Sequence, residues 1–366
     1  MARTSNGSEP VVRVLVITVV HHPEDARIRH RQLPALLDAG FEVTYVAPRG
    51  DITTPPAHLH RIEIPRADGR HRLAALRAAR EVLAEESPKV DLTIVHDPEL
   101  TLLDRWITGP KLWDVHEDLP AQLADKTWIP STLRGTTRTA AKLLNRRAQH
   151  RFECIIAEPG YAKSFLDASV VRNAVNVPTD VASSGPGRAV YLGRVSRGRG
   201  AEVLAEVSEQ LPESISLEVF GPVEQDAASL HRSAAHIHGF VPNDTALEKV
   251  EGATVGLSLL EDLPNYRHSM PTKILEYLAR GVPVVTTPLP EARQIIEAHN
   301  CGIVVPFGDA DAVTNAIISL NDDEGERRRL AENGRRGVQK YFNWTDDAAI
   351  FVDVCQKIAA GQTQRT

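Results

Sequence analysis

The sequence predicts an α/β protein of two domains, each a parallel sheet with helices on both faces. A chain of 366 residues exceeds one ordinary hydrophobic core, which favours two domains. Short Val- and Ile-rich runs alternate with longer amphipathic stretches, the pattern of doubly wound sheets. The alternation pauses at residues 173–187, where Asn, Pro, Ser and Gly accumulate. We therefore expect domains at residues 1–178 and 186–343, with a last helix at 344–366 packing back on the first domain.

Each expected strand is a short apolar run that ends at a turn. In the first domain these runs are Val11–Val19, Glu42–Ala47, His58–Ile64, Asp91–Val95, Lys111–Val115 and Cys154–Ala157. In the second they are Ala189–Leu192, Ser216–Phe220, Ala235–His238, Ala253–Ser258, Val282–Thr286 and Gly302–Val305. The intervening helices include Arg27–Ala39 and Arg72–Glu86, whose apolar residues recur at spacings of three and four. Ligands of such sheets bind beyond the carboxyl ends of the strands, so we expect the site in a cleft between the domains.

Composition excludes several classes of protein. With 42% hydrophobic and 25% charged residues the chain is typical of a folded globular protein, and its net charge of −6 disfavours a generally basic nucleic-acid binder. The charge is unevenly divided: residues 1–178 carry 24 Lys and Arg against 22 Asp and Glu, whereas the remainder carries 18 against 26. The three cysteines are too far apart for a disulfide framework, and the first apolar run is interrupted by Arg13 and lacks a cleavage site. We expect a cytoplasmic protein with reduced thiols.

The stretch HSMPTKILEYLARGVPVV, which starts at residue 268, predicts a helix suited to binding a phosphate. Ser269 can cap this helix, whose first turn would contain a proline. Thr272, Lys273 and Glu276 would place a hydroxyl, an ammonium and a carboxylate beside the free amides of the helix N-terminus. The alternative is a capped surface helix with an exposed Lys–Glu pair.

A glycine-rich turn, YLGRVSRGRG, begins at residue 191 and carries three arginines, Arg194, Arg197 and Arg199. Glycines allow close backbone approach, and guanidinium groups match phosphate oxygens. A solvated basic turn is the alternative. The acidic surroundings of this half favour an anion-binding turn.

These two segments resemble those of retaining glycosyltransferases of the GT-B type, and within them family 4. That family has a "GR…KG" turn, fitted here by Gly193-Arg194 and Arg199-Gly200, with Arg in place of the usual Lys. It also has an "E-x7-E" motif before "GVPVV"; Glu276 fits the second Glu, and His268 stands where the first would be. The stretch HGFV from residue 238 resembles the family's "G-x-V" turn near the nucleotide base.

The resemblance implies a GT-B fold, in which two Rossmann-like doubly wound domains face each other across a cleft. It also implies retaining transfer of a sugar from a nucleotide-diphosphate sugar, without a metal or another cofactor. Arg194 and Arg199 would hold the diphosphate and Glu276 the ribose. The donor-binding residues that it implies are Gly193, His238, His268, Ser269, Met270, Thr272 and Lys273.

Three polar clusters follow expected strands of the first domain. The runs HHPEDAR from residue 21, HDPE from residue 96 and DVHED from residue 114 resemble the "D-x-R", "HDPEL" and "D-x-HE" segments of a bacterial subgroup of this family. The resemblance implies that His116 is catalytic and reaches the donor sugar or its phosphate from across the cleft. The acceptor-side residues would be His21, His22, Asp25, Arg27 and His96. A metal site is disfavoured because the spacings match no closed-site pattern, and helix capping by Asp97 and Asp118 is an alternative for those two residues.

Basic residues recur every four positions in RGTTRTAAKLLNRRAQH, at Arg134, Arg138, Lys142 and Arg146. Such a helix could rest on an anionic membrane. Its apolar partners are small and lack aromatics, which favours a solvated face.

Missing motifs limit the alternatives. The sequence has no G-x-G-x-x-G after the first strand, no G-x-S-x-G elbow and no P-loop, which disfavours dehydrogenases, common hydrolases and P-loop enzymes. A GT-B nucleotide-sugar epimerase and a non-catalytic two-domain ligand-binding or sensor protein remain alternatives. The expected partners are a nucleotide-sugar donor and a glycan, lipid-linked or small-molecule acceptor, with no nucleic acid and at most peripheral membrane contact.

Overall fold

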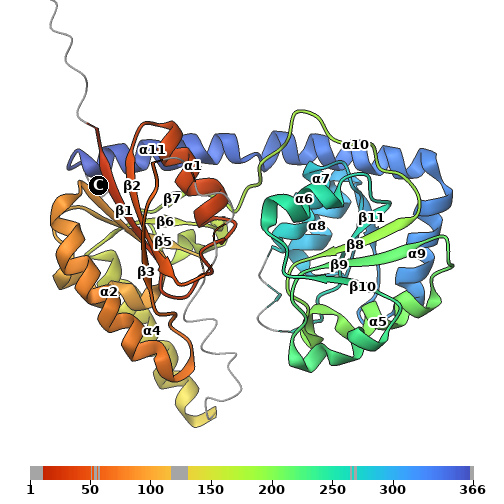
Figure 1. The fold of residues 1–366 in the computed structure, drawn as a ribbon, viewed down its shortest axis with the longest axis horizontal. Coiled ribbons are helices and arrows are strands. Elements are labelled where there is room, and N and C mark those ends of the chain that lie inside the picture. The colour runs from red at the N-terminus through yellow and green to blue at the C-terminus, as the bar shows by residue number, and fades with distance from the viewer. Residues whose placement is uncertain are drawn as a thin grey trace, which may run out of the picture. The chain divides into compact units, whose positions relative to one another are not determined.

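The computed structural model describes residues 11–50, 52, 56, 58–116, 131–263, 266–267 and 270–362, with residues 131–138 as backbone alone. The chain divides into two compact units: Met1–Arg172 with Thr345–Thr366 form unit 1, and Asn173–Trp344 form unit 2. Each unit holds one parallel sheet with helices on both faces (Figure 1), which confirms the predicted fold class.

The sheet of unit 1 has the strand order β3-β2-β1-β4-β5-β6-β7, and all neighbours are parallel. Its strands are β1 (Arg13–Ile17), β2 (Glu42–Pro48), β3 (His60–Ile64), β4 (Leu92–Val95), β5 (Lys111–Val115), β6 (Glu153–Ile156) and β7 (Ser169–Val170). Six of these match predicted runs within a few residues. The two-residue β7 was not predicted, because so short a segment carries no hydrophobic period.

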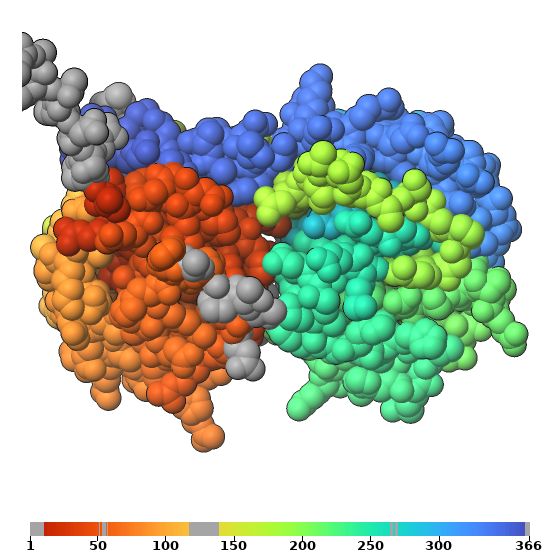
Figure 2. All heavy atoms as spheres, turned by 45° about the horizontal axis from the view of Figure 1, so that its top comes forward, coloured from red at the N-terminus to blue at the C-terminus, as the bar shows by residue number. Residues whose placement is uncertain are grey.

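Helices cover both faces of this sheet. They are η1 (Ile28–Gln32), α1 (Leu33–Asp38), η2 (Gly69–His71), α2 (Arg72–Glu86), η3 (Ser87–Lys89), η4 (Pro98–Trp106), α4 (Ser131–Gln149), η5 (Pro159–Lys163) and α11 (Trp344–Ala359). Helices α2 and α4 share one core, to which they contribute Ala79 and Ala148. Figure 2 shows the blue residues of α11 lying on the red N-terminal segments of the same unit.

The predicted helix at residues 27–39 begins with an unusual turn. Its first five residues form the π-helix η1, in which the amide of Gln32 donates to the carbonyl of Arg27 at 2.9 Å. Such π-helical turns are rare in proteins, and many of those that occur lie at functional sites. This one follows the polar loop that begins at His21.

The sheet of unit 2 has the order β10-β9-β8-β11-β12-β13 and is also parallel. Its strands are β8 (Arg188–Leu192), β9 (Ser216–Phe220), β10 (His236–Gly239), β11 (Val255–Ser258), β12 (Val284–Thr286) and β13 (Gly302–Val304). Its helices are η6 (Arg197–Arg199), α5 (Ala201–Gln210), η7 (Gln225–Arg232), α6 (Asn243–Val250), α7 (Thr272–Ala279), α8 (Pro290–His299), α9 (Ala310–Asp322) and α10 (Glu324–Tyr341). One core lies under α5 and α9 and the other under α6, α7 and α8. None of the helices in the described part of the chain combines the length and apolar content needed to cross a bilayer.

The segment at 173–187 is attached to unit 2 by two arginines of α10. Arg335 donates to the carbonyl of Pro178 at 2.5 Å, and the buried Arg327 donates to that of Ser184 at 3.4 Å. These contacts explain why the division falls before residue 173, although the composition of the whole segment is that of a linker.

Helix α7 is held against the sheet by the buried Tyr277. Its hydroxyl accepts a hydrogen bond from the amide of Leu192 at 2.7 Å and donates to the carbonyl of Leu257 at 3.2 Å. The ring lies directly on Gly256, where an added Cβ would come within 2.3 Å of a ring carbon. Only glycine fits beneath this ring, so the N-terminus of α7 has a fixed height above the strand ends.

We expect Gly256→Ala to lower the free energy of unfolding by about 1–3 kcal/mol, because the methyl group must displace a pinned, buried ring. Thermal unfolding measures this effect. Gly325→Ala in α10 is the control, because the atom nearest to its methyl group, Asp323 Oδ1, would lie 3.4 Å away. Equal unfolding midpoints for both variants would contradict the close contact.

Candidate functional site

The turn after β8 in unit 2 has the backbone that its glycines predict. Gly193 and Gly200 have φ angles of +92° and +89°. A Cβ at Gly200 would come within 2.4 Å of the carbonyl oxygen of Leu259, whereas one at Gly193 would meet nothing within 4 Å. Gly200 therefore serves close packing, and Gly193 leaves the backbone open to a ligand.

The three arginines of this turn differ in their partners. Arg194 pairs with Glu224 at 2.8 Å and Arg197 with Glu202 at 2.7 Å, all on the exposed surface. Within the described residues Arg199 has no carboxylate partner, and its guanidinium lies 6.0 Å from the ring centroid of Tyr266. The expectation that all three face an anion is therefore too broad, and Arg199 is the cation of the turn that lacks an acidic neighbour.

Lys273 supplies a second cation at the same edge of the sheet. Its side chain is only 9% exposed, and Nζ lies 3.6 Å from the ring centroid of Tyr191, the last-but-one residue of β8. Burial lowers the pKa of Lys273 well below its usual value, and the nearby charge of Arg199 lowers it further, although the Glu276 carboxylate opposes both. The described residues place no carboxylate in ion-pair contact with this ammonium. A bound anion would supply the missing partner.

The start of α7 adds amide donors beside Lys273. The helix begins at Thr272, and Pro271 occupies the capping position without a side-chain hydrogen bond. The predicted proline in the first turn is therefore wrong, because Pro271 precedes that turn. Ser269, predicted to cap the helix, and His268 lie outside the described residues. The first amides of a helix have no partner within it, so this end favours an anion. The alternative of an exposed Lys–Glu pair is also wrong, because Glu276 is only 7% exposed.

His238 and Met270 were also predicted on the donor side; His238 lies near the carboxyl end of β10, and Met270 lies two residues before α7 begins. The ring of His238, on β10, stacks on Phe220 with centroids 4.4 Å apart, and its Nε2 lies 3.2 Å from Glu218. Met270 is half-buried against the core beneath α7. The partly exposed ring of His238 offers a flat surface at the carboxyl end of the edge strand.

In unit 1 the polar residues gather at the carboxyl ends of β1, β4 and β5. Asp97, which is buried, accepts hydrogen bonds from the Thr18 hydroxyl at 2.9 Å and the Val19 amide at 2.6 Å. Its other oxygen lies 3.6 Å from Nε2 of His21. Asp97 precedes η4 but makes no capping bond there, so the capping interpretation of this residue is wrong. Asp118 lies outside the described residues.

The central contact of this cluster joins two imidazoles. Nδ1 of His96 lies 2.9 Å from Nε2 of His116, and these atoms lie 3.5 and 3.4 Å from Oδ2 of Asp114. Burial lowers the pKa of His116 to about 3, although the Asp114 carboxylate opposes this and Arg27 adds to it. Burial alone would raise the pKa of Asp114, but the Arg27 guanidinium holds it well below the usual value. His116 is therefore a neutral hydrogen-bonding group at neutral pH.

The loop after β1 brings further predicted residues to the same place. Nδ1 of His21 lies 3.1 Å from Asp25, and the ring centroids of His21 and His116 are 5.1 Å apart. Burial would raise the pKa of Asp25, but the hydrogen bond to His21 lowers it well below its usual value. His22 belongs to the other side of this loop, where burial lowers the pKa of its ring and Arg66 adds to the effect.

A divalent cation could bridge three atoms of this cluster, since the ligand atoms of His96, Asp114 and His116 lie within 4.8 Å of one another. The Asp114 carboxylate, however, already accepts three hydrogen bonds from Arg27 and Gln32, and a guanidinium beside a metal repels it. We interpret the cluster as a hydrogen-bonded group. Asp114 and Gln32 were given no role from the sequence, although a carboxylate inside the apolar run KLWDV is a signal of function.

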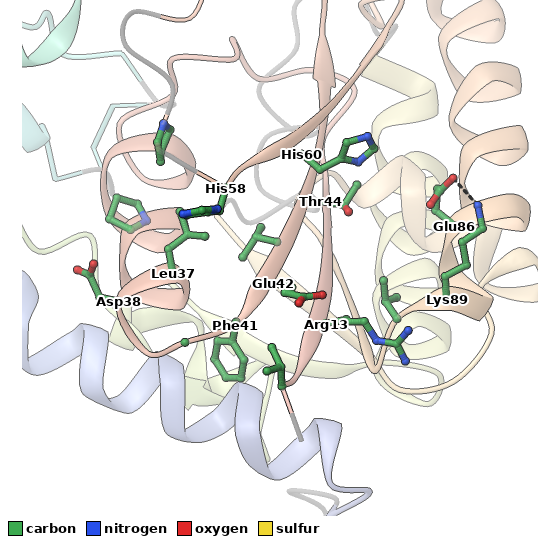
Figure 3. Close-up of a pocket in the computed structure, with 16 residues that line it drawn as sticks. Arg13, Leu37, Asp38, Phe41, Glu42, Thr44, His58, His60, Glu86 and Lys89 are labelled. Atoms are coloured by element: carbon green, nitrogen blue, oxygen red, sulfur yellow. Dashed lines mark hydrogen bonds and ion pairs between the residues drawn. The ribbon is translucent and has the colours of Figure 1, made fainter. Parts of the chain in front are cut away.

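A hollow of about 1070 Å³ opens at the opposite end of the same sheet (Figure 3). Arg13 and Glu42, the first residues of β1 and β2, line it. Nζ of Lys89, which lines the hollow, lies 2.8 Å from Oε1 of Glu86, and Nε of Arg13 lies 3.5 Å from Oδ2 of Asp91. The arginine and the lysine of this hollow are thus paired locally, and the hollow lies away from the strand ends that carry the imidazoles.

The basic helix α4 uses its apolar side inside unit 1. Ala141 and Ala148 are buried, whereas Leu143 is 59% exposed. Arg147 bonds to Asp104 at 2.5 Å on the neighbouring η4. The core therefore takes up Ala141 and Ala148 of the predicted apolar face, whereas Ala140 and Leu143 stay exposed.

One family model matches a part of the second unit. Residues 186–323 match the family model described as "Glycosyl transferases group 1". The chain is 28% identical over 171 residues to the D-inositol 3-phosphate glycosyltransferase of Xylanimonas cellulosilytica, which covers 45% of this chain and 41% of the relative. It is 27% identical over 162 residues to the MMP alpha-(1->4)-mannosyltransferase of Mycolicibacterium hassiacum, covering 44% and 38%. The matches thus span about two fifths of the length of these curated relatives.

Solved structures resemble the whole chain. Sucrose-phosphate synthase from Thermosynechococcus elongatus has a TM-score of 0.74 at 18% identity, covering 96% of this chain and 100% of that one. Anabaena HepE in complex with UDP-glucose has a TM-score of 0.68 at 14% identity, covering 94% and 99%. The chain therefore has the GT-B fold, and its residues 186–323 match the family of group 1 glycosyl transferases.

Proposed function

We propose that the chain is a retaining glycosyltransferase of family 4 that moves a sugar from a nucleotide-diphosphate sugar to an acceptor. The match of residues 186–323 to group 1 glycosyl transferases supports the reaction class. A structural neighbour that binds UDP-glucose supports a nucleotide-sugar donor. The acceptor is a glycan, a lipid-linked glycan or a small molecule, and the enzyme works in the cytoplasm with at most peripheral membrane contact.

One observation carries this proposal: the buried ammonium of Lys273 has no carboxylate partner among the described residues and lies beside the N-terminus of α7. Arg199 lies near enough to lower its pKa. Two cations and free helix amides together match a diphosphate, which carries the charge that develops as the sugar leaves. With this charge neutralised by side chains, transfer needs no metal ion. Glu276 of the same helix would accept hydrogen bonds from the ribose.

The histidine cluster of unit 1 would serve the sugar and the acceptor. His116 is neutral, so it can hydrogen-bond to a sugar hydroxyl or a phosphate oxygen without acting as a fixed charge. In a front-face reaction a donor phosphate oxygen takes the acceptor proton, and no protein nucleophile is required. His21, Asp25 and His96 would then line the acceptor side. Positioning and stabilisation of the leaving group would supply the catalysis.

The test compares two arginines of one turn. Arg199→Gln should weaken binding of UDP or GDP by about 10- to 100-fold and raise the donor KM, because a charge-assisted contact is lost. Arg197→Gln, which removes a surface pair with Glu202, is the matched control and should bind as the wild type does. Calorimetry with each nucleoside diphosphate measures the difference. Equal affinities for the two variants would remove Arg199 from the diphosphate site.

Product analysis separates transfer from the alternatives. An epimerase converts its nucleotide sugar without an acceptor and releases no nucleoside diphosphate. A sensor binds the nucleotide and leaves the sugar attached. Incubation with UDP-, GDP- and TDP-sugars, followed by chromatography of nucleotides and sugars, should instead show acceptor-dependent release of the nucleoside diphosphate.

A further inference from the structure

Arg27 occupies a position between the imidazole cluster and a distant part of the chain. Its side chain is 4% exposed. Nε and Nη2 donate to the two oxygens of Asp114 at 2.8 and 2.9 Å, so the ion pair is bidentate. Nη2 also donates to the carbonyl of Val171 at 2.8 Å, and Nη1 to that of Arg172 at 3.0 Å. One planar group thus connects the end of β5 to residues 171–172.

Asp114 transmits this geometry to the imidazoles. Its Oδ2 also accepts a hydrogen bond from Gln32 at 2.6 Å, and it lies about equally far from the ring nitrogens of His96 and His116. Both oxygens are therefore fixed from one side by Arg27 and Gln32. A carboxylate fixed in this way sets where the two imidazoles can lie.

Residues 171–172 are where the chain leaves unit 1 for the first time, since the division falls between Arg172 and Asn173. The second crossing falls between Trp344 and Thr345. On the side of unit 1, Arg172 binds the fully buried Asp347 through its amide at 2.7 Å and its guanidinium at 2.9 Å. In unit 2 the amide of Val175 donates to Phe342. In each unit, the first crossing segment is therefore hydrogen-bonded to the second.

Any motion of one unit against the other must change the backbone at these two crossings. We propose that Arg27 is a positioning residue that couples the crossing segment at residues 171–172 to the His96–His116 pair through Asp114. This inference rests on the proposed function, in which His116 contacts the donor sugar. Movement of the crossing segment would then shift the imidazoles as the enzyme takes up or releases its ligands.

A lysine could carry the charge of Arg27 but not its geometry. Its single ammonium has no planar fork, so it cannot make two parallel bonds to Asp114 and still reach two carbonyls. Arg27→Lys therefore separates positioning from charge. Asp347→Asn is the second variant; it loosens Arg172 from α11 without altering Arg27 or Asp114, and it carries the test should Arg27→Lys fail to fold.

The experiment measures turnover, nucleotide affinity and the titration of one imidazole. Arg27→Lys should lower kcat for the nucleotide sugar by about tenfold or more, and Asp347→Asn should lower it in the same direction. The Kd for UDP or GDP should stay within about twofold of the wild type, since the proposed nucleotide contacts lie in unit 2. Arg147→Lys, at the pair of the partly exposed Arg147 with the buried Asp104 in unit 1, is the control and should change neither.

The imidazole titration gives a readout that does not depend on turnover. The charged and titratable groups facing His116 are Asp114 on β5, His96 after β4, and His21, Asp25 and Arg27 from the segment after β1. In Arg27→Gln the pKa of His116 should rise, because the guanidinium that opposes its protonation is gone while Asp114 remains. NMR of histidine-labelled protein, with His116→Gln to assign the signal, measures this shift.

Wild-type turnover in Arg27→Lys, or in Asp347→Asn where the lysine variant does not fold, would overturn the coupling and leave Arg27 a structural residue. An unchanged His116 titration in folded Arg27→Gln would overturn it independently. If the wild type turns over none of the nucleotide sugars, the proposed function fails, and the NMR titration still decides whether Arg27 controls the imidazole.

Discussion

Lys273→Met is expected to lower kcat/KM for the nucleotide-sugar donor by about 100-fold or more, because it removes a cation from the leaving diphosphate. The ammonium is held by burial and by the face of Tyr191, so it needs no reorganisation when charge develops. Methionine has a similar length and no charge, which limits the change in packing. Steady-state kinetics with the preferred nucleotide sugar measures the loss, with exposed Lys249→Met of the same unit as the control.

The same substitution should make the ligand-free protein more stable. The ammonium of Lys273 is buried and makes no ion-pair contact with a carboxylate of the described residues, and its lowered pKa, which Glu276 only partly opposes, indicates that the charged form destabilises the fold. An apolar side chain of similar shape removes that penalty, so the free energy of unfolding should rise by about 1 kcal/mol or more. UDP should then raise the thermal midpoint of the wild type far more than that of the variant. A variant that loses activity and stability together would indicate a structural role for Lys273 instead.

The strands of both sheets could be predicted from sequence because a buried parallel strand is a local pattern. Runs such as Ser216–Phe220 and Lys111–Val115 have the predicted bounds. The point at which the chain divides into two units, in contrast, depends on contacts between residues far apart in the sequence. Composition marks a linker at 173–187, but its attachment to unit 2 depends on Arg335, which follows more than 150 residues later and has no signature in the linker itself.

The candidate site was predictable in residue type but not in partners. The spacing of Lys273 and Glu276 on one helix predicts a phosphate site, and the structure adds that both are buried. The contact of Lys273 with Tyr191 joins residues far apart in sequence, and so does the pairing of Arg194 with Glu224. Such contacts arise only when strands and helices assemble, and they decide which cations remain without an acidic neighbour.

In unit 1 the same limit applies to Asp114. Three polar clusters at strand ends predict a shared site, because the carboxyl ends of parallel strands meet at one edge. The bidentate pair of Asp114 with Arg27 joins β5 to the loop after β1, 87 residues earlier. From sequence, Arg27 belongs to a cluster on the acceptor side; in the structure its guanidinium is buried against Asp114 and backbone carbonyls.

Acid should destabilise unit 1 at pH values where ordinary carboxylates are still charged. In the folded chain the pKa of His116 is lowered from 6.5 to about 3, so the unfolded chain takes up a proton there that the folded chain does not. This group's contribution to stability is complete above pH 6.5 and is lost as the pH falls towards 3. The free energy of unfolding should therefore fall with a slope that approaches about 1.4 kcal/mol per pH unit, or by roughly 2 kcal/mol between pH 6.5 and 4.5.

Two aspartates near His116 have shifted pKa values but do not contribute to the fall in unfolding free energy between pH 6.5 and 4.5. Asp25 and Asp114 have lowered pKa values, so their contributions are lost only below about pH 3.8. His22 also has a lowered pKa and adds to the slope of His116. Urea unfolding at a series of pH values, followed through the fluorescence of the buried Trp113 on β5, measures the change. His116→Gln should flatten the curve between pH 6.5 and 4.5, and an unaltered slope in that variant would show that His116 is already charged in the folded chain.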